Sequence, residues 1–303
     1  MKPTASDRRA LAAFMAPAIA VMVVFFILPI LYVLVVSCLK WNGISAPQAV
    51  GIENFVKLLK NSTFQRSLKN NVSWALVAGF IQVPLAMVMA IILSRKPRGW
   101  KFFRTVYFFP QVISGIALAT LWRAIYNAEH GMLNGMLSAV GLGHLATDWL
   151  GKSSTAFPAV LIYWVFYVGY YMVIMMADIT TIDSSYYEAA TIDGATDFQQ
   201  AIYITIPLIK KTSLLTCVTL ASVMGLRQFE QVYMLTNGGP NHRTSTMVLY
   251  MYERLQSESY GLASATAVIL IVVGVIFIVC IRKLFNGRSE AAELRRKARR
   301  AVR

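Results

Sequence analysis

Long apolar runs dominate the pattern of the chain. Six of them approach or exceed about 20 residues, the length that an α-helix needs to cross a bilayer. They cover residues 11–36, 72–93, 106–126, 157–177, 212–235 and 262–281. A transmembrane β-barrel would instead show segments of about 10 residues in which apolar and polar positions alternate. The runs are continuously apolar, so the sequence predicts an all-α integral membrane protein with six spans in a single transmembrane domain, residues 1–303.

Composition supports a membrane protein. The chain is 57% hydrophobic and 14% charged, with a mean hydropathy of +0.56, whereas roughly a quarter of the residues of a soluble domain are charged. The first run follows basic residues, as in a secretory signal peptide, but it exceeds the usual core of about 7–15 apolar residues and has no clear cleavage site. We expect it to remain as an anchor. Cys38, Cys217 and Cys280 lie in or beside apolar runs without metal or disulfide spacing, so we expect them to pack.

The distribution of basic residues indicates the orientation of the chain. The net charge is +15, and Lys and Arg in short loops mark the cytoplasmic side of a membrane. With the N-terminus inside, 19 basic residues fall on the inside and 8 on the outside. The basic tail 282–303 has one aromatic residue and no nucleic-acid motif, which favours membrane lipid over nucleic acid as its partner. We therefore predict that both termini are cytoplasmic.

The inner loop 182–211 has an unusual charge. It holds four of the 14 acidic residues of the chain: Asp183, Glu188, Asp193 and Asp197. A helix that lies on lipid headgroups normally carries Lys and Arg on its polar face, and anionic lipid would repel these carboxylates. The loop is therefore predicted to contact a protein partner.

Local signals predict a short helix in this loop. Ser184 is a capping residue, and Ala189 and Ala190 favour helix. Gly194 costs about 1 kcal/mol relative to Ala inside a helix, which predicts a turn, a helix end or a close approach of another backbone. Pro207 is expected to stop or kink the segment before the fifth span.

One motif in the loop resembles a known family. "EAA", three residues, "G", nine residues, and "I", one residue, an apolar residue and "P" are matched by Glu188, Ala189, Ala190, Gly194, Ile204, Ile206 and Pro207. The pattern resembles the EAA loop of binding-protein-dependent ABC importer permeases, with Ile206 where Leu is commoner. The resemblance implies a type I importer-like fold in which this loop, here called the coupling loop (residues 182–211), forms helices that dock into a cytoplasmic ATP-binding subunit. Asp193, beside Gly194, belongs to the same predicted docking region.

Further segments resemble the carbohydrate-uptake subgroup of that family. They include "FFPQVISGIALATLWRAIYNAEHGMLNGMLSAVGL", "MLTNGGPNHRTSTMVLYMYE" and the start "APAIAVMVVFFILPILYVLVVS", which fits the first permease of a pair, as in maltose and glycerol-phosphate importers. The resemblance implies a homologous second permease, two ATP-binding subunits, an extracellular or periplasmic solute-binding protein and a carbohydrate solute. ATP and Mg would be bound by the partner ATPase, with no cofactor on this chain. A prokaryotic plasma membrane is also implied.

An outer turn follows the fifth predicted span. Asn237, Gly238, Gly239 and Pro240 are typical turn residues. The turn can be a tight exit from the membrane and nothing more. The resemblance implies instead a surface near the docked solute-binding protein, and the residues leave both interpretations open.

Polar and aromatic residues within spans suggest a solute pathway, because such groups usually face a bundle interior or a wet cavity. Tyr163, Tyr167 and Tyr170, with Tyr171, recur at helical spacing, and tyrosine rings suit the C–H faces of a sugar. A packing stripe is the alternative. By resemblance, the fourth and fifth spans line the cavity, which adds Gly225 and Gln228 as candidates.

A second class of transporter is the runner-up. Arg227 and Glu230 are three residues apart and can pair on one helix face, as in an ion-coupled secondary transporter. That class often contains internal repeats, and the sequence has no convincing one.

An ATP site within the chain is not predicted. "ATDWLGKS", residues 146–153, satisfies a permissive nucleotide pattern but lacks its first glycine and lies in a predicted outer loop. No metal-ligand or hydrolytic set stands out, and the three histidines fall in outer loops. The sequence therefore argues against an enzyme.

Overall fold

The computed structural model describes residues 5–301, with side chains at residue 11 and in 13–285. Most side chains of the predicted basic tail, and those of the basic residues before the first span, therefore lie outside the described residues. Within the described part, five helices are long and apolar enough to cross a membrane, or six spans if one bent pair counts as a span. The five are Ala13–Ser37, Ser62–Ser94, Ala156–Ile179, Asp197–Leu226 and Tyr260–Phe285, and the pair is Trp100–Val112 with Gly115–Ile125.

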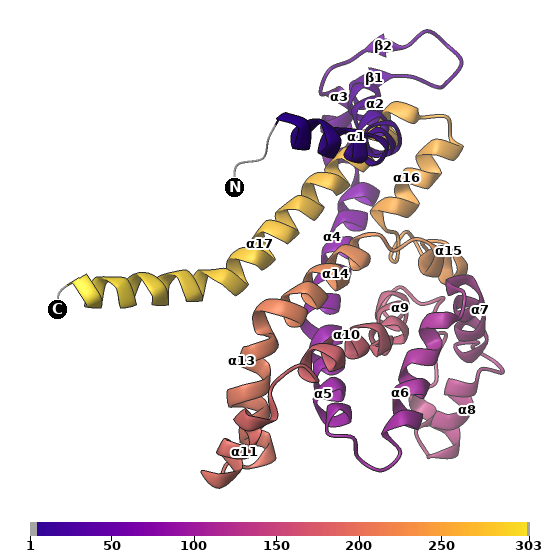
Figure 1. Cartoon of the computed structure of the whole chain (residues 1–303). Coiled ribbons are helices and arrows are strands. Elements are labelled where there is room, and N and C mark those ends of the chain that lie inside the picture. Colours follow the sequence, from indigo (N-terminus) through magenta and orange to yellow (C-terminus); the bar gives the residue numbers. More distant parts are fainter. Residues whose placement is uncertain (1–4, 302–303) are drawn as a thin grey trace. The chain divides into compact units, whose positions relative to one another are not determined.

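The described residues form two compact units, where the sequence predicts one domain. The first combines residues up to Gln65 with Tyr250–Ile271. Its α-helices and strands are labelled in Figure 1. Its elements are α1 (Ala5–Met22), η1 (Val23–Ile27), α2 (Leu28–Ser37), β1 (Leu39–Lys40), β2 (Gln48–Ala49), α3 (Glu53–Lys60) and parts of α4 (Ser62–Val77), α16 (Met247–Gln256) and α17 (Tyr260–Ala301). β1 and β2 pair antiparallel, with Leu39 opposite Ala49. The buried Asn54 amide donates to the Ser37 carbonyl at 2.8 Å, which fastens α3 to the end of α2.

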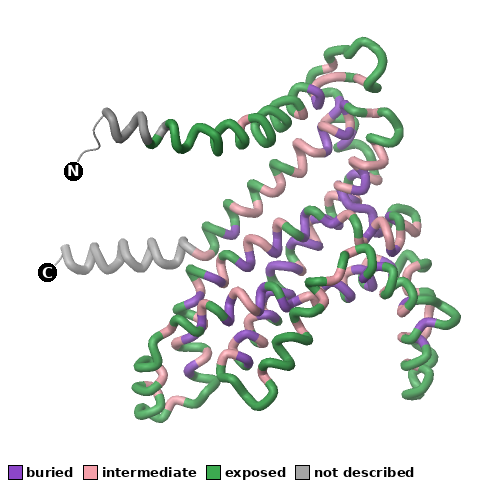
Figure 2. The backbone as a smooth tube through the Cα atoms, turned by 45° about the vertical axis from the view of Figure 1, so that its right-hand side comes forward, coloured by how far each residue is buried: buried purple, intermediate pink, exposed green. Residues whose placement is uncertain are grey.

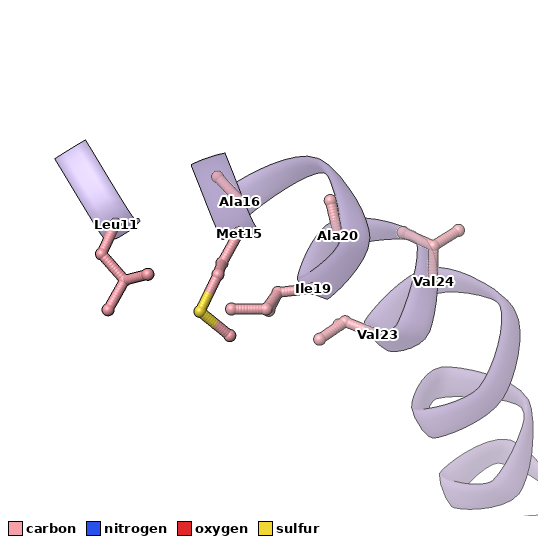
Figure 3. Close-up of a pocket in the computed structure, with 7 residues that line it drawn as sticks. All are labelled: Leu11, Met15, Ala16, Ile19, Ala20, Val23 and Val24. Carbon is pink, nitrogen blue, oxygen red and sulfur yellow. The ribbon is translucent and has the colours of Figure 1, made fainter. Parts of the chain in front are cut away.

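The first span is exposed along nearly its whole length (Figure 2), and only 6% of its most apolar stretch of 18 residues is buried. Figure 3 shows the side chains that line a shallow pocket on α1 and η1: Leu11, Met15, Ala16, Ile19, Ala20, Val23 and Val24. All are apolar, so this face suits lipid or another apolar helix. It offers no polar group that could orient a solute.

The second unit comprises Arg66–Leu249 and Val272 onward. After α4 its elements are η2 (Ala78–Gln82), α5 (Val83–Ser94), α6 (Trp100–Phe108), η3 (Phe109–Val112), α7 (Gly115–Ile125), α8 (Met132–Ala139), η4 (Gly143–Leu145), α9 (Ala156–Val165), α10 (Gly169–Ile179), α11 (Ser184–Ile192), α12 (Asp197–Gln200), η5 (Ala201–Thr205), α13 (Ile206–Ile209), η6 (Lys210–Leu214), α14 (Leu215–Leu226) and α15 (Glu230–Thr236). In this unit α10 packs against α5, α15 against α7, and α14 against η2. Trp74, Tyr163, Met172 and Met175 are almost completely buried and form much of its core.

Two helical segments differ in extent from the predicted spans. The third span bends by 102° between Val112 and Gly115, after a 3₁₀ turn that contains Pro110. The fifth span begins at Asp197 instead of residue 212 and ends at Leu226 instead of 235. Hydropathy does not determine where these helices bend or end, because both depend on where the backbone groups find hydrogen-bond partners.

The sequence predicts that Pro207 stops or kinks the segment, and the structure excludes the stop. The proline lies near the start of α13, between the π-helices η5 and η6, and the helix continues from Asp197 to Leu226. A proline lacks the N–H for an i→i−4 bond and its ring crowds the preceding turn, whereas a wider π-turn accommodates such an interruption. The coupling loop is therefore helical over much of its second half.

Candidate functional site

The first helix of the coupling loop is α11. Asp183 caps it by accepting the Ser185 N–H at 2.9 Å, and this bond holds the pKa of the Asp183 carboxyl below its usual value. Glu188 and Ala189 are exposed and Ala190 is half-buried. The predicted helix is therefore present, with part of the EAA pattern open to solvent.

A turn separates α11 from the fifth span. Asp193 ends α11, and Gly194 follows with φ +77°, the left-handed conformation that favours glycine. Thr196 then starts α12 with a capping box: its N–H donates to Gln199 Oε1 at 2.7 Å, and its Oγ1 accepts the Gln199 N–H at 3.3 Å. Gly194 is therefore a helix end, one of the three roles that the sequence allows for it.

Side-chain hydrogen bonds fold α11 back onto the start of the fifth span. The hydroxyls of Tyr187 and Thr205 lie 3.0 Å apart. Gln200, which is buried, donates to the Thr191 hydroxyl at 3.0 Å and to the Ala195 carbonyl at 3.3 Å. These contacts make α11, the turn and η5 one packed piece, although most of its surface is exposed.

Arg95 attaches this piece to the second span. Its guanidinium forms an ion pair with the Asp197 carboxylate and donates to the Asp197 carbonyl at 2.8 Å. A cavity of about 330 Å³ lies between the ends of the second and fourth spans and the coupling loop, lined by residues that include Tyr187 and Gln200. Sequence analysis missed Arg95, because 102 residues separate it from Asp197.

Large apolar side chains are exposed among the carboxylates of this loop. Tyr186 is 56%, Ile192 86% and Phe198 73% exposed. Aromatic and aliphatic side chains inside a polar rim are typical of protein–protein interfaces, and they are costly to leave in water. The geometry therefore fits a docked protein better than a solvated loop.

The candidate pathway residues separate into two groups. Tyr163 is 2% exposed, and its ring centre lies 5.5 Å from those of both Trp122 and Tyr167. Tyr170 is 45% exposed and contacts Tyr171 instead. Tyr163 is a packed core residue in the single chain, whereas Tyr170 presents a free ring face. Their contact with solute stays a prediction.

The fourth span is broken between α9 and α10, where helical hydrogen bonding lapses. Gln82, from the second span, donates to the carbonyls of Trp164 and Tyr167 at 3.0 Å each. Gln111, from the third, donates to the same Tyr167 carbonyl at 3.2 Å. Non-helical backbone at membrane depth needs such partners. Three spans thus meet at one polar point beside the tyrosines.

Gly225 and Gln228 are both buried. A Cβ on Gly225 would lie 2.9 Å from the Cα of Ala75, so α14 and α4 approach closely there. The Gln228 amide donates to the Met224 carbonyl at 3.3 Å, and its backbone carbonyl accepts the Thr246 hydroxyl at 2.8 Å. Packing explains Gly225, whereas the buried Gln228 Oε1 has no hydrogen-bond partner among the described residues. The contact of either residue with solute stays a prediction.

The predicted Arg227–Glu230 pair does not form. α14 ends at Leu226 and α15 begins at Glu230, so no continuous helix places the two side chains on one face. Among the side chains that the structure describes, no ion pair joins them, and both are exposed. Glu230 instead lies against α7, with Oε2 2.9 Å from where a Cβ of Gly115 would be.

The outer signature is a tightly bonded loop. Asn237 and Gly238 have φ +47° and +79°, and the Gly239–Pro240 peptide is cis. Thr244, fully buried, donates to the Gly239 carbonyl at 2.9 Å. Hydrogen bonds within the loop thus hold its shape. Such a loop can be a tight exit from the membrane or a surface near the solute-binding protein, so both predicted roles stay open.

Polar residues of α4 hold this loop from the other side, a role that the sequence did not reveal. The Asn70 amide donates to the carbonyls of Arg243 and Ser245 at 2.9 and 2.8 Å. Asn71, which is fully buried, donates to the Leu226 carbonyl at 2.5 Å and accepts the Met247 N–H at 2.8 Å. The end of the fifth span and the outer loop therefore share one anchor.

Replacing Asn71 by alanine should lower the stability of the folded chain by about 1–3 kcal/mol, because buried polar groups lose their partners. The groups that would lose the Asn71 side chain as a hydrogen-bond partner are the Leu226 carbonyl and the Met247 N–H. Thermal unfolding of the purified protein in detergent measures the effect. Ser73→Ala is the control, since this residue of the same helix bonds only its own helix. Equal unfolding temperatures for the two variants would contradict the anchor.

A metal centre finds no support. Within the described residues, no group of three or more His, Cys, Asp or Glu could hold a metal ion. The "ATDWLGKS" segment forms turns between η4 and α9, and Asp148 there bonds the Gly151 N–H at 2.8 Å. This backbone does not resemble a phosphate-binding loop.

Comparison with known proteins gives consistent matches. The family described as binding-protein-dependent transport system inner membrane component matches residues 82–290. The chain is 34% identical over 284 residues to the probable ABC transporter permease protein YurN of Bacillus subtilis (strain 168), covering 91% of this chain and 96% of YurN. It is 32% identical over 302 residues to the diacetylchitobiose uptake system permease protein NgcF of Streptomyces coelicolor, covering 94% and 85%.

A solved structure shares the fold. It is a crystal structure of a bacterial alginate ABC transporter in complex with alginate pentasaccharide-bound periplasmic protein. One of its chains superposes with a TM-score of 0.75 at 23% identity, covering 90% of this chain and 92% of that one.

Proposed function

The chain belongs to the family of inner membrane components of binding-protein-dependent transport systems, and we propose that it is the permease subunit of an ATP-driven importer that receives its solute from a separate binding protein. The observation that carries this proposal is α11, an exposed acidic helix with the EAA pattern, held against the fifth span at the end of the bundle that we assign to the cytoplasm. The chain forms half of the translocation pathway, and a homologous second permease forms the other half.

Energy for transport comes from two copies of an ATP-binding subunit. These partners bind ATP and Mg and hydrolyse the ATP, while this chain binds no cofactor and is not an enzyme. Glu188, Ala189, Ala190, Asp193, Gly194 and Pro207 form the coupling region. ATPase closure pushes α11, and the packed coupling loop passes the push to the spans as a rigid-body movement. The ATP-binding subunit contacts α11 differently in the two states of the transporter, and a two-state transition requires such a difference in contacts.

The solute is a sugar or oligosaccharide. NgcF is the permease of a diacetylchitobiose uptake system, and the solved structure is that of an alginate ABC transporter. The exposed ring of Tyr170 and the polar groups at the break of the fourth span supply the two kinds of contact that a pyranose needs, an apolar face and hydrogen bonds. The Asn237–Pro240 turn lies on the outer side, where the solute-binding protein docks. The chain sits in a prokaryotic plasma membrane with both termini in the cytoplasm.

Uptake in a strain that lacks this chain tests the proposal. Radiolabelled maltose, lactose and diacetylchitobiose are offered singly to the strain with and without the restored gene. We expect one of them to enter only with the gene, and uptake to fall when cellular ATP is depleted but not when a protonophore alone collapses the proton gradient. Mass spectrometry of the tagged, purified chain should find an ATP-binding subunit and a second permease. A chain that purifies alone and transports on the proton gradient would contradict the proposal.

A further inference from the structure

Asp178 lies at the point where the fourth span enters the coupling loop. It is in the last turn of α10, and its carboxylate reaches across to η6, at the other end of the loop. Oδ2 accepts the Thr212 hydroxyl at 2.5 Å and the Ser213 N–H at 3.2 Å. One side chain thereby closes a loop that runs through 34 positions of sequence, from Asp178 to Thr212.

The surroundings make this contact specific. α10 packs against η6, α13 and α14, and Ile209 and Cys217 on either side of the contact are 1% or less exposed. A π-helix changes which N–H meets which carbonyl, so backbone donors at its edges need other acceptors. The Asp178 carboxylate is the acceptor for the Ser213 N–H, and a charged acceptor makes a stronger bond than a neutral one.

We propose that Asp178 is a positioning residue for transport: it locks the two ends of the coupling loop together, so that a push on α11 moves the fourth and fifth spans as one body. The inference rests on the proposed coupling function of the loop. Two attachments then hold the loop. Arg95 fixes it to the second span through Asp197, and Asp178 fixes its base. Without the second attachment the end of the fourth span can shift relative to the fifth span, so a push on α11 no longer moves the two spans together.

The bonding pattern supplies matched variants. Asp178→Asn keeps an oxygen acceptor of the same size, whereas Asp178→Ala removes it. Thr212→Ser keeps the donating hydroxyl, whereas Thr212→Val removes it at nearly constant volume. Asp183→Ala is the control, because Asp183 is also a carboxylate of this loop that accepts a backbone N–H, from Ser185, but it caps α11 and joins no two spans.

Hydrogen exchange in the purified complex, with MgATP and vanadate as the probe, tests the lock. Asp178→Ala should raise exchange across residues 209–216 about 10-fold, the factor that corresponds to losing a hydrogen bond to a charged group. Asp178→Asn should raise that exchange less than Asp178→Ala does, because a neutral amide oxygen still accepts the bond but more weakly. Asp183→Ala should change only the first turn of α11. Unchanged exchange at 209–216 in Asp178→Ala would overturn the lock.

Transport separates a positioning role from a merely structural one. Sugar taken up per ATP hydrolysed should fall about 10-fold in Asp178→Ala and Thr212→Val, whereas the conservative variants Asp178→Asn and Thr212→Ser should retain most of it. The double variant Asp178→Ala with Thr212→Val should lose no more than Asp178→Ala alone, because Asp178→Ala already removes the bond to the Thr212 hydroxyl. A normal ratio in Asp178→Ala, in a complex whose wild type is ATP-driven, would overturn the positioning role alone. A wild type that ignores ATP would instead overturn the proposed function, and exchange would still decide the lock.

Discussion

Replacing Gly194 by tryptophan should abolish ATP-driven uptake and retention of the ATP-binding subunit while the chain still inserts into the membrane. Two physical effects combine. Gly194 has φ +77°, a conformation that costs a residue with a Cβ roughly 1–2 kcal/mol. No atom lies within 4 Å of the position of its Cβ, so a side chain there meets no immediate neighbour in this chain. The indole would occupy the space at the end of α11 that we assign to the partner.

A second glycine, Gly141, serves as a control that separates the loss of docking from the backbone strain. Gly141 has φ +80°, and its Cβ position is equally empty, but it follows α8 in a predicted outer loop. Gly141→Trp imposes the same backbone strain and should leave uptake and subunit retention within about 2-fold of wild type, since surface changes away from special contacts rarely exceed about 0.5 kcal/mol. Co-purification quantified by mass spectrometry and sugar uptake give the two measurements. Full activity in Gly194→Trp would eliminate the coupling role.

Gly225→Leu should prevent the second unit from packing, the largest loss of stability among these variants. A Cβ at Gly225 would already lie 2.9 Å from the backbone N and Cα of Ala75. Backbone cannot rotate away as a side-chain tip can, so α14 and α4 must separate and pull apart buried neighbours. Overpacking typically costs about 1–3 kcal/mol, and a clash with backbone belongs at the upper end or beyond. We expect little folded protein in detergent.

Two further variants sharpen this test. A Cβ on Gly135, in α8, would have no atom within 4 Å. Gly135→Leu should therefore leave the unfolding temperature unchanged or slightly higher, because leucine is the better helix former. Gly225→Ala should lie between the extremes in thermal unfolding. If Gly225→Ala keeps its unfolding temperature but loses sugar uptake, the close-packing explanation fails and the predicted place of Gly225 in the solute pathway gains support.

Hydropathy predicted the helical class of the fold and the approximate location of its spans, but not where the backbone departs from helix. Apolar runs report which segments suit lipid, whereas helix ends depend on partners for the freed backbone groups. Gln82 and Gln111 supply such partners to Tyr167 from two other spans. No local pattern near residue 167 contains that information.

The coupling loop was the most predictable part of the site, because its signals are local. Alanines and a glycine within a few residues predicted α11 and its end, and the structure contains both. The cap is Asp183 instead of the predicted Ser184. The contacts that hold the helix in place were not predicted. Arg95 and Asp178 each act across a long stretch of sequence, and side chains at such separations meet only through the tertiary fold.

The π-turns of the fifth span also determine which way the residues beyond them face around the helix axis. Each residue advances an α-helix by about 100°, so one residue added or removed turns everything beyond it by that amount. η6 lies between α13 and α14, next to the Asp178 contact. Regular α-winding of the same five residues would advance everything beyond them further around the axis and swing the face that carries Gly225 away from Ala75. The rotational setting of the fifth span thus depends on the irregularity of a single turn.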